Sequence, residues 1–273
     1  MTGAQDWIGR VGRTWAGMAD ATDRSFREVT AALLERIEPT RYGRALDIGC
    51  GAGDLTLALA AANPVGDIVG VDISADLIAV ATERGDGNPS ACFVEDDAAT
   101  TAIGRIDRFD LLVSRHGVMF FPDPVAAFAH LRTIAAPGAR LVFSCFRARE
   151  ENRWALQLAE AVGADTAPAD PTAPGPFAFG DRERVEAILA EAGWQDIAFD
   201  ALDCPMTAGE GADAVEEALA YYRRIGPAAR ALAEMPEEAR AAALDRLRTM
   251  LAGAERDGVV ALPAAVWLVS ART

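Results

Sequence analysis

Residues 46–54 read LDIGCGAGD, in which an aspartate near the end of an apolar run is followed by three glycines at alternate positions. A glycine-rich turn after a buried strand lets a ligand approach the backbone closely, because glycine has no Cβ atom and tolerates positive φ angles. The stretch therefore predicts a strand, a ligand-binding turn and the start of a helix. Which ligand binds depends on the spacing of the glycines and of the acidic residues around them.

Apolar segments of strand and helix type alternate along most of the chain. Ser74, and Asp123 followed by Pro124, mark helix starts, whereas Gly85 marks a helix end. Strands are expected at 44–49, 67–73, 91–98, 108–115, 139–146, 196–203 and 264–272. The main helices are expected at 6–38, 54–62, 182–192, 213–225 and 228–254. This order predicts an α/β fold with a Rossmann-like, seven-stranded, mostly parallel sheet, helices on both faces and a helical lid.

Three parts of one fold are expected along the chain. Residues 1–42 would form an N-terminal helical cap, 43–146 a cofactor-binding α/β core, and 147–273 the rest of the sheet with inserted lid helices. The insertions follow the fifth and sixth strands, and one contains a Pro/Gly-rich loop longer than an ordinary connection. Since ligands gather at the carboxyl ends of parallel strands, both insertions are expected to cover the site.

Composition excludes several classes of function. The 273 residues carry a formal net charge of −15, which disfavours a nucleic-acid partner because such binding needs a basic face. We expect no membrane insertion, since no apolar stretch reaches the roughly 20 residues that cross a bilayer. The four cysteines lack paired spacing, which predicts reduced thiols and a cytoplasmic location. Neither histidine lies near a cysteine, so no metal is expected. The oligomeric state is left open.

The spacing of the glycines distinguishes between two possible nucleotide-type cofactors. A dinucleotide fingerprint has the form G-x-G-x-x-G, but Gly49, Gly51 and Gly53 alternate, and Asp54 takes the third-glycine position. A nicotinamide cofactor is therefore less favoured. With Asp47 before the glycines and Asp72 ending the second strand, the pattern resembles the opening motif D/E-x-G-x-G-x-G of class I S-adenosylmethionine-dependent methyltransferases.

The resemblance covers about residues 44–146 and implies S-adenosylmethionine as the cofactor. In that family the glycine loop lies against the methionine part, and an acid in the position of Asp72 accepts hydrogen bonds from both ribose hydroxyls. Asp97 and Ala98 best match the element that meets the adenine, with Asp96 as the rival to Asp97. The cofactor-binding residues implied are Trp15, Asp47, Gly49, Gly51, Gly53, Asp72, Ile73, Asp97, Ala98 and Ser114.

The stretch SRHGVMFFPDP, residues 114–124, is similar to the ubiquinone- and menaquinone-biosynthesis-type branch, which methylates small molecules. It lacks the Asn-Pro-Pro-aromatic signature of amino-methylating enzymes, so exocyclic amines are disfavoured as acceptors. His116 follows the fourth strand, and its ordinary pKa of ~6.5 would suit a general base, although the residue could instead simply pack or hydrogen-bond in a wall. Trp15 could cover the cofactor near its sulfonium as a cation–π partner, or it could pack in the core.

Aromatic residues near the expected lid suggest an enclosed, mostly apolar acceptor pocket. The candidate walls are Phe120, Phe121, Trp154, Phe177, Phe179, Tyr221 and Tyr222. These observations predict an enzyme that moves the methyl of S-adenosylmethionine to a small, largely hydrophobic acceptor by in-line displacement. Two alternatives stay open, namely an NAD-dependent oxidoreductase and a cofactor-binding protein without turnover. The acceptor atom, whether oxygen, carbon or nitrogen, is not determined by the sequence.

Overall fold

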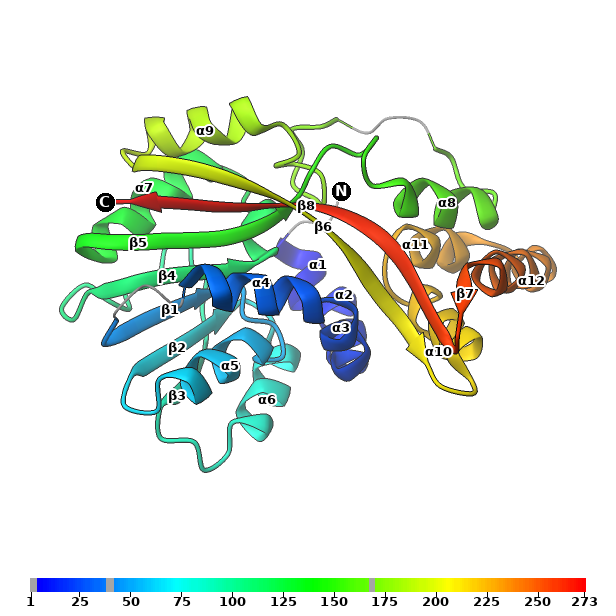
Figure 1. The fold of residues 1–273 in the computed structure, drawn as a ribbon, viewed down its shortest axis with the longest axis horizontal. Helices are drawn as coiled ribbons and strands as arrows, with labels where there is room; N and C mark the ends of the chain where they lie inside the picture. Colours follow the sequence, from blue (N-terminus) through cyan, green and yellow to red (C-terminus); the bar gives the residue numbers. More distant parts are fainter. Residues whose placement is uncertain (1–3, 38–41, 167–169) are drawn as a thin grey trace.

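A twisted sheet forms the centre of the computed structural model, which describes residues 4–37, 42–166 and 170–273 (Figure 1). The strand order is β3-β2-β1-β4-β5-β8-β6. The pairs from β3 to β5 are parallel, whereas β8 runs antiparallel to both β5 and β6. The strands are β1 Arg44–Ile48, β2 Asp67–Asp72, β3 Ala91–Glu95, β4 Phe109–Arg115, β5 Ala135–Phe146, β6 Gln195–Glu210 and β8 Val259–Arg272. The predicted seven-stranded, mostly parallel sheet is confirmed, with the two-residue β7 (Glu255–Arg256) added beside β8.

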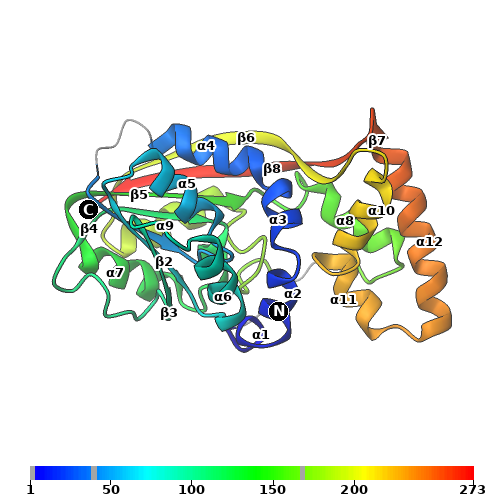
Figure 2. The same cartoon turned by 90° about the horizontal axis from the view of Figure 1, so that it is seen from below.

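Helices cover both faces of this sheet. Figure 2 shows α4 (Arg27–Ile37) and α5 (Asp54–Ala62) on one face, and α7 (Pro124–Ile134) and α9 (Arg182–Glu191) lie on the other. Helix α6 (Ala75–Arg84) contacts β2 and β3. The predicted caps are present, because Ser74 Oγ accepts a hydrogen bond from Leu77 N, Asp123 Oδ1 accepts one from Ala126 N, and Gly85 follows the last turn of α6. Among the described residues, no helix is long and apolar enough to span a bilayer.

The N-terminal segment is not the single long helix that its spacing predicts. It forms α1 (Ala4–Ile8), α2 (Arg10–Ala16), α3 (Ala19–Ser25) and then α4, with breaks at Gly9, Met18 and Phe26; residue 38 lies outside the described residues. The breaks let α2 turn against the start of α6, where a Cβ atom at Gly12 would clash with Ser74 Oγ. Tertiary packing thus overrides the helical periodicity, and α1–α3 bend over the carboxyl edge of the sheet.

Strands β6 and β8 are longer than the sequence predicts, and they leave the sheet as a two-stranded ribbon. Their pairing runs from Gln195↔Arg272 to Glu210↔Val259, whereas β5 pairs with β8 only as far as Val266. Pro205 lies opposite Pro263 in the part beyond β5, where each strand has one free edge and a missing N–H group is tolerated. These prolines make β6 appear to end early and β8 appear to begin late in the sequence.

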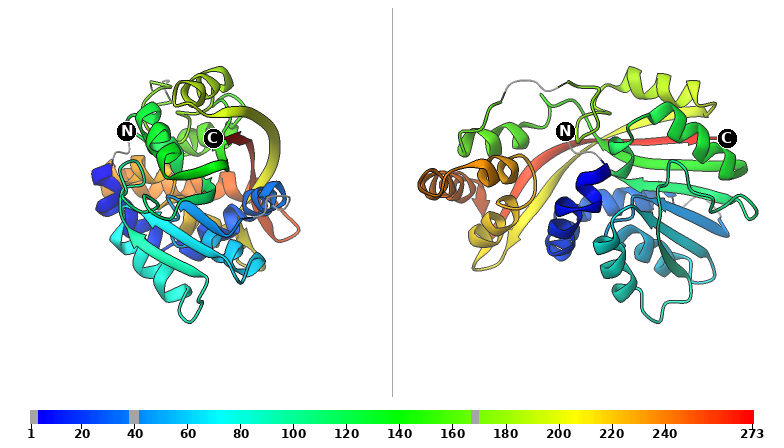
Figure 3. Two further views of the ribbon diagram at one scale, coloured as in Figure 1. Left: turned by 90° about the vertical axis from the view of Figure 1, so that its left-hand side faces the viewer. Right: turned by 180° about the vertical axis from the view of Figure 1, so that it is seen from behind.

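The ribbon carries a group of four helices that we call the helical lobe. It consists of α8 (Arg153–Ala161), α10 (Ala214–Tyr222), α11 (Pro227–Glu234) and α12 (Glu237–Ala254). Figure 3 shows the lobe at the end of the molecule opposite the C-terminus, with α1–α3 between it and the α/β core. The helix predicted over 228–254 is interrupted, because Pro236 begins a new helix. The two insertions that follow the fifth and sixth predicted strands meet in this lobe, because α8 of the first contacts α11 and α12 of the second.

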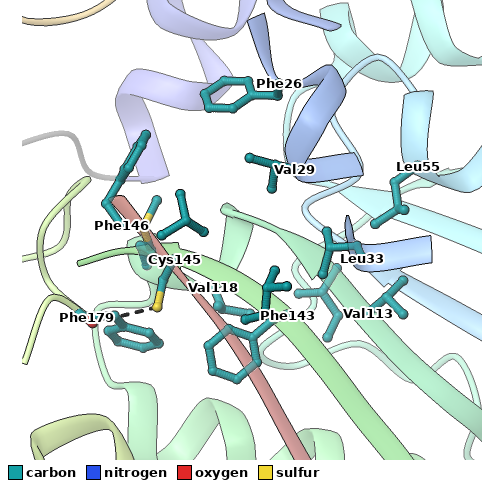
Figure 4. Packing of buried hydrophobic residues seen from close by; sticks show 14 of the residues in the cluster. Phe26, Val29, Leu33, Leu55, Val113, Val118, Phe143, Cys145, Phe146 and Phe179 are labelled. Carbon is teal, nitrogen blue, oxygen red and sulfur yellow. Dashed lines mark hydrogen bonds between the residues drawn. The ribbon is translucent and has the colours of Figure 1, made fainter. Parts of the chain in front are cut away.

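Alternation along β5 decides which side chains face the site. Phe143 and Cys145 point to one face, where the Cys145 thiol donates a hydrogen bond to the Phe179 carbonyl at 3.6 Å. Phe146 points to the other face, and its ring centroid lies 6.3 Å from that of Phe26 (Figure 4). Successive residues of a strand face opposite sides of the sheet, so residues packed on Phe143 are separated from those packed on Phe146.

Candidate active site

A cavity of about 260 Å³ lies at the carboxyl ends of β1, β2 and β4. We call one part the loop side; it is formed by residues 47–52, 72–73 and 96–98. The other part, the aromatic side, is formed by Phe26, His116, Phe146, Trp154, Tyr221 and Tyr222. The cavity therefore joins the sheet edge, the N-terminal helices and the helical lobe in a single site.

The three glycines after β1 have three different reasons to be glycine. A Cβ atom at Gly49 would lie 3.0 Å from the Gly117 Cα atom, so Gly49 allows two backbones to approach. Gly51 lines the cavity at a φ of +55°, and a Cβ atom there would meet nothing within 4 Å. At Gly53 a Cβ atom would lie 2.9 Å from the Phe93 ring. Open space next to the backbone is thus found at Gly51, whereas Gly53 serves packing and does not line the cavity.

Two aspartates, Asp47 and Asp72, lie next to this loop. The Asp72 carboxylate accepts hydrogen bonds from Gly51 N at 3.0 Å and from Ser74 N at 2.9 Å, and it lines the cavity. Asp47 is buried, accepts a hydrogen bond from Thr56 Oγ1 at 2.7 Å, and keeps its second oxygen, Oδ1, without a partner among the described residues. Burial raises the pKa of both carboxyls, that of Asp47 to about 7. A buried oxygen without a partner is suited to a ligand that donates a hydrogen bond.

The two rival aspartates after β3 differ in what they already bind. Asp96 accepts hydrogen bonds from Asp97 N at 2.8 Å and from Thr101 Oγ1 at 2.6 Å, which engages both of its oxygens. Asp97 is exposed and accepts one from Ala99 N at 2.9 Å. Both aspartates line the cavity beside Ala98, and Ile73 lines it from the end of β2. The side chain of Asp97 is thus the freer one for a ligand.

Ser114 does not reach the cavity that the sequence places it beside. Its side chain is fully buried, donates a hydrogen bond to the Ile48 carbonyl at 2.7 Å, and accepts one from Gly117 N at 3.1 Å. Ser114 therefore ties the end of β4 to the end of β1. It supports the loop side from behind.

His116 lines the aromatic side of the cavity. Its φ is +67°, its backbone N–H donates to the Ser144 carbonyl, and its Nδ1 atom lies 2.7 Å from Ser144 Oγ. The imidazole packs edge-on against Phe26 and Phe146, with ring centroids 5.1 and 4.4 Å away. This burial, aided by the nearby Arg115 charge, lowers the pKa of His116 to about 3. The ring therefore stays neutral near pH 7, unlike the titrating base that the sequence suggests.

Sequence reasoning missed an ion-pair cluster next to this histidine. Arg115 contacts Asp54 and Asp23, and its Nη1 atom also donates to Thr30 Oγ1 at 2.8 Å. Asp23 binds Arg84 as well, at 2.7 Å, and so links α3 to both β4 and α6. Arg115 lines the cavity with its charge already neutralised. The partners come from distant parts of the chain, so no local pattern indicates them.

The predicted aromatic walls divide into two groups. Phe120, Phe121, Trp154, Tyr221 and Tyr222 line the cavity. Phe179 does not, because it packs against Phe143 and Phe128 on the opposite face of β5. Phe177 also stays outside the lining and stacks behind Trp154 and Phe146.

Further aromatic residues line the cavity that the sequence did not indicate, namely Trp7, Phe26 and Phe146. Trp15 also lines it, packed against Ala52 of the glycine loop and Leu77 of α6. Trp7 contacts Trp15 and Phe120 edge-on, with centroids 5.3 and 5.1 Å away. The N-terminal helices thus close the cavity with two indoles. No group of three metal-ligating side chains occurs in the described parts of the chain.

Comparison with known proteins agrees with this geometry. The chain matches the family described as "Methyltransferase domain" over residues 19–198. It is 28% identical over 190 residues to a demethylmenaquinone methyltransferase from Roseiflexus castenholzii, covering 65% of this chain and 77% of the relative. It is also similar to a trans-aconitate 2-methyltransferase from Variovorax paradoxus, with 31% identity over 161 residues, 59% of this chain and 57% of the relative.

A solved structure shows the same fold across the whole chain. Phosphoethanolamine N-methyltransferase 2 of Haemonchus contortus, in complex with S-adenosyl-L-methionine, is 18% identical with a TM-score of 0.60. The match covers 100% of this chain and 60% of that chain. These matches do not favour an NAD-dependent oxidoreductase or a protein without turnover. Because the family match spans well over half of the sequence, the chain belongs to the class I S-adenosylmethionine-dependent methyltransferases.

Proposed function

We propose that the cavity binds the cofactor on its loop side and a small, largely hydrophobic acceptor on its aromatic side. The observation that carries this proposal is the continuity of the cavity, which joins the glycine loop to aromatic residues of the helical lobe. A shared, water-poor space is what a direct transfer between two bound molecules needs. S-adenosylmethionine, when bound, supplies a methyl group that its sulfonium already activates for in-line displacement.

The residues of the loop side fit this cofactor. We propose that Gly49 and Gly51 leave room for the methionine part, that Asp72 accepts hydrogen bonds from the ribose, and that Ile73, Asp97 and Ala98 enclose the adenine. The open space beside Gly51 and the unpartnered Asp47 Oδ1 support this assignment, because each can accommodate a polar ligand group. Gly53 and Ser114 act behind the site in this proposal. Trp15 covers it from the N-terminal side.

The chain contributes mainly alignment to the reaction in this proposal. Holding two reactants in the right geometry can be worth roughly 7–11 kcal/mol of barrier lowering. His116 is proposed to bind rather than to take up a proton, because its pKa of about 3 makes it a weak base. The acceptor is then one that needs no strong base, or one whose proton leaves to solvent.

Calorimetry and an activity assay test the proposal. We expect wild-type protein to bind S-adenosylhomocysteine and to show no binding of NAD. With a panel of small hydrophobic metabolites, S-adenosylhomocysteine should accumulate only when an acceptor is present. Binding of NAD without binding of S-adenosylhomocysteine would overturn the assignment, and cofactor binding without product from any acceptor would favour a protein without turnover.

Two wider assignments accompany this function. We propose that residues 1–42 act as the cap, 43–146 as the cofactor-binding core and 147–273 as the rest of the sheet with the lid. A cytoplasmic location is supported by the four cysteines, all of which are free thiols. The net charge of −15 supports the absence of a nucleic-acid partner. Fractionation of cells and a DNA-binding titration at low salt would test these two points.

A further inference from the structure

Buried polar atoms without a partner gather around the cavity. Among the described residues, five such side-chain atoms belong to cavity-lining residues, namely Trp7, Thr22, Asp47, His116 and Tyr222, of which the Thr22 hydroxyl also interacts with Tyr221. The remaining ones are all arginine Nε atoms outside the lining. Since folded proteins satisfy most buried polar groups, a concentration of unpaired ones at one cavity points to a ligand that completes them.

Two of these atoms belong to residues of the aromatic side. His116 is 7% exposed and Tyr222 is 2% exposed, and their Nε2 and Oη atoms have no hydrogen-bond partner among the described residues. His116 directly follows β4, whereas Tyr222 is the last residue of α10 in the helical lobe. We propose that His116 Nε2 and Tyr222 Oη recognise the polar group of an uncharged, hydroxyl-bearing acceptor. This inference rests on the methyl-transfer function proposed above.

The charge of the cavity favours an uncharged group over an anion. Arg115 is the one cation among the described lining residues, and Asp23 and Asp54 already neutralise it. A carboxylate or phosphate on the aromatic side would thus lose its hydration without gaining a free counter-charge. The structure thus predicts an uncharged acceptor for this protein, whereas the names of the trans-aconitate and phosphoethanolamine enzymes indicate charged acceptors for those two proteins.

Hydrogen-bonding capacity favours a hydroxyl in particular. The 2.7 Å contact between His116 Nδ1 and Ser144 Oγ holds the ring and leaves Nε2 as either donor or acceptor, according to the tautomer. Tyr222 Oη can donate and accept. A hydroxyl can also do both, so it completes either arrangement, whereas an ammonium only donates and a carboxylate only accepts.

Binding of three matched probes to the protein loaded with S-adenosylhomocysteine tests the proposal. The probes are 2-naphthol, 2-naphthoate and 2-naphthylmethylamine, which share one apolar body and differ in the charge of the polar group. We expect 2-naphthol to bind at least about tenfold more tightly than either charged probe. Tighter binding of a charged probe overturns the proposal, and so does failure of all three probes to bind. Failure of the wild-type protein to bind S-adenosylhomocysteine would instead overturn the proposed function.

Two variants and a matched control assign the recognition to the two residues. Tyr222→Phe removes an unpaired hydroxyl, so its melting temperature should be equal to or above that of wild type, while 2-naphthol affinity falls about threefold to tenfold. His116→Asn should lower 2-naphthol affinity similarly and leave S-adenosylhomocysteine affinity within twofold. Tyr42→Phe, whose hydroxyl bonds to the Leu59 carbonyl outside the cavity, should leave 2-naphthol affinity unchanged. Unchanged 2-naphthol affinity in either folded cavity variant overturns the proposal.

Discussion

The Nδ1 atom of His116 lies 2.7 Å from Ser144 Oγ, and the backbone N–H of His116 donates to the carbonyl of the same serine. One residue of β5 therefore fixes both the ring and the backbone of the residue that follows β4. This double attachment, together with the rings of Phe26 and Phe146, keeps the imidazole buried and neutral.

The first prediction concerns the pH dependence of stability. Burial lowers the pKa of His116 to about 3, so between about pH 4 and 6.5 the unfolded chain binds this proton and the folded one does not. The His116 contribution to stability thus rises with pH. Burial raises the pKa of Asp47 to about 7, so its contribution falls with pH over the same interval. The two slopes oppose each other in wild type.

Single variants should separate the two slopes. Relative to wild type, Asp47→Asn should gain stability with rising pH between about 4.5 and 6.5, by at most ~1.4 kcal/mol per pH unit. His116→Asn should show the opposite slope. Urea unfolding at three pH values measures both differences. Parallel curves for all three proteins would show that neither group is shifted.

The second prediction concerns Asp72. Asp72→Asn removes the charge that accepts hydrogen bonds at the loop side and should weaken S-adenosylhomocysteine binding by about 1.5–3 kcal/mol. Asp76→Asn is the matched control, since Asp76 lies in the first turn of the adjoining helix α6 and outside the cavity lining. Calorimetry should give wild-type affinity for this control. Equal affinities for both variants would remove Asp72 from the cofactor site.

A third prediction contrasts two glycines of the loop. Gly51→Ala places a methyl group in open cavity space, so it should weaken S-adenosylhomocysteine binding more than it lowers stability. Gly53→Ala drives a Cβ atom against the Phe93 ring at a φ of +88°, and should lower stability by about 2–4 kcal/mol. Thermal unfolding and calorimetry on both variants test the contrast. The reverse pattern would contradict the loop geometry.

The fourth prediction concerns the ion-pair cluster that the sequence did not reveal. Arg115→Met leaves Asp23 and Asp54 near each other without their shared cation, and should lower stability by about 2 kcal/mol, since the Arg115 side chain is only 13% exposed. Arg248→Met provides the surface control. Its pair with Glu216 is about half exposed and screened by water, so this variant should unfold at the same urea concentration as wild type.

Local signals explain why residues 44–146 were predictable. Ser74 and Asp123 cap helices through hydrogen bonds to residues three positions away, and β1, β2 and β4 are mostly buried apolar runs. Such signals lie within one short window of sequence. The position of Phe179 was not predictable, because it depends on which face of β5 the returning loop reaches.

The character of His116 also depends on distant contacts. Its neighbours Phe26 and Ser144 lie far from it in the sequence, on α3–α4 and on β5, and together they bury the ring. The pattern around residue 116 therefore predicted its place near the site but not its lowered pKa. In the same way, the prolines at 205 and 263 concealed the ribbon, because their tolerance depends on free edges that only the sheet order reveals.

The ribbon formed by β6 and β8 gives the two ends of the molecule different local stabilities. Residues 266–272 of β8 pair with β5 on one side and β6 on the other. Residues 259–265 pair only with β6 and, at Val259 and Val260, with β7. Backbone amides of Val259–Leu262 should therefore exchange with deuterium faster than those of Leu268–Ala271, through openings short of global unfolding. Tyr222 belongs to the helical lobe, which the ribbon carries at the end that lies away from the sheet. A molecule that contacts both Tyr222 and His116 should therefore slow the deuterium exchange of Val259–Leu262.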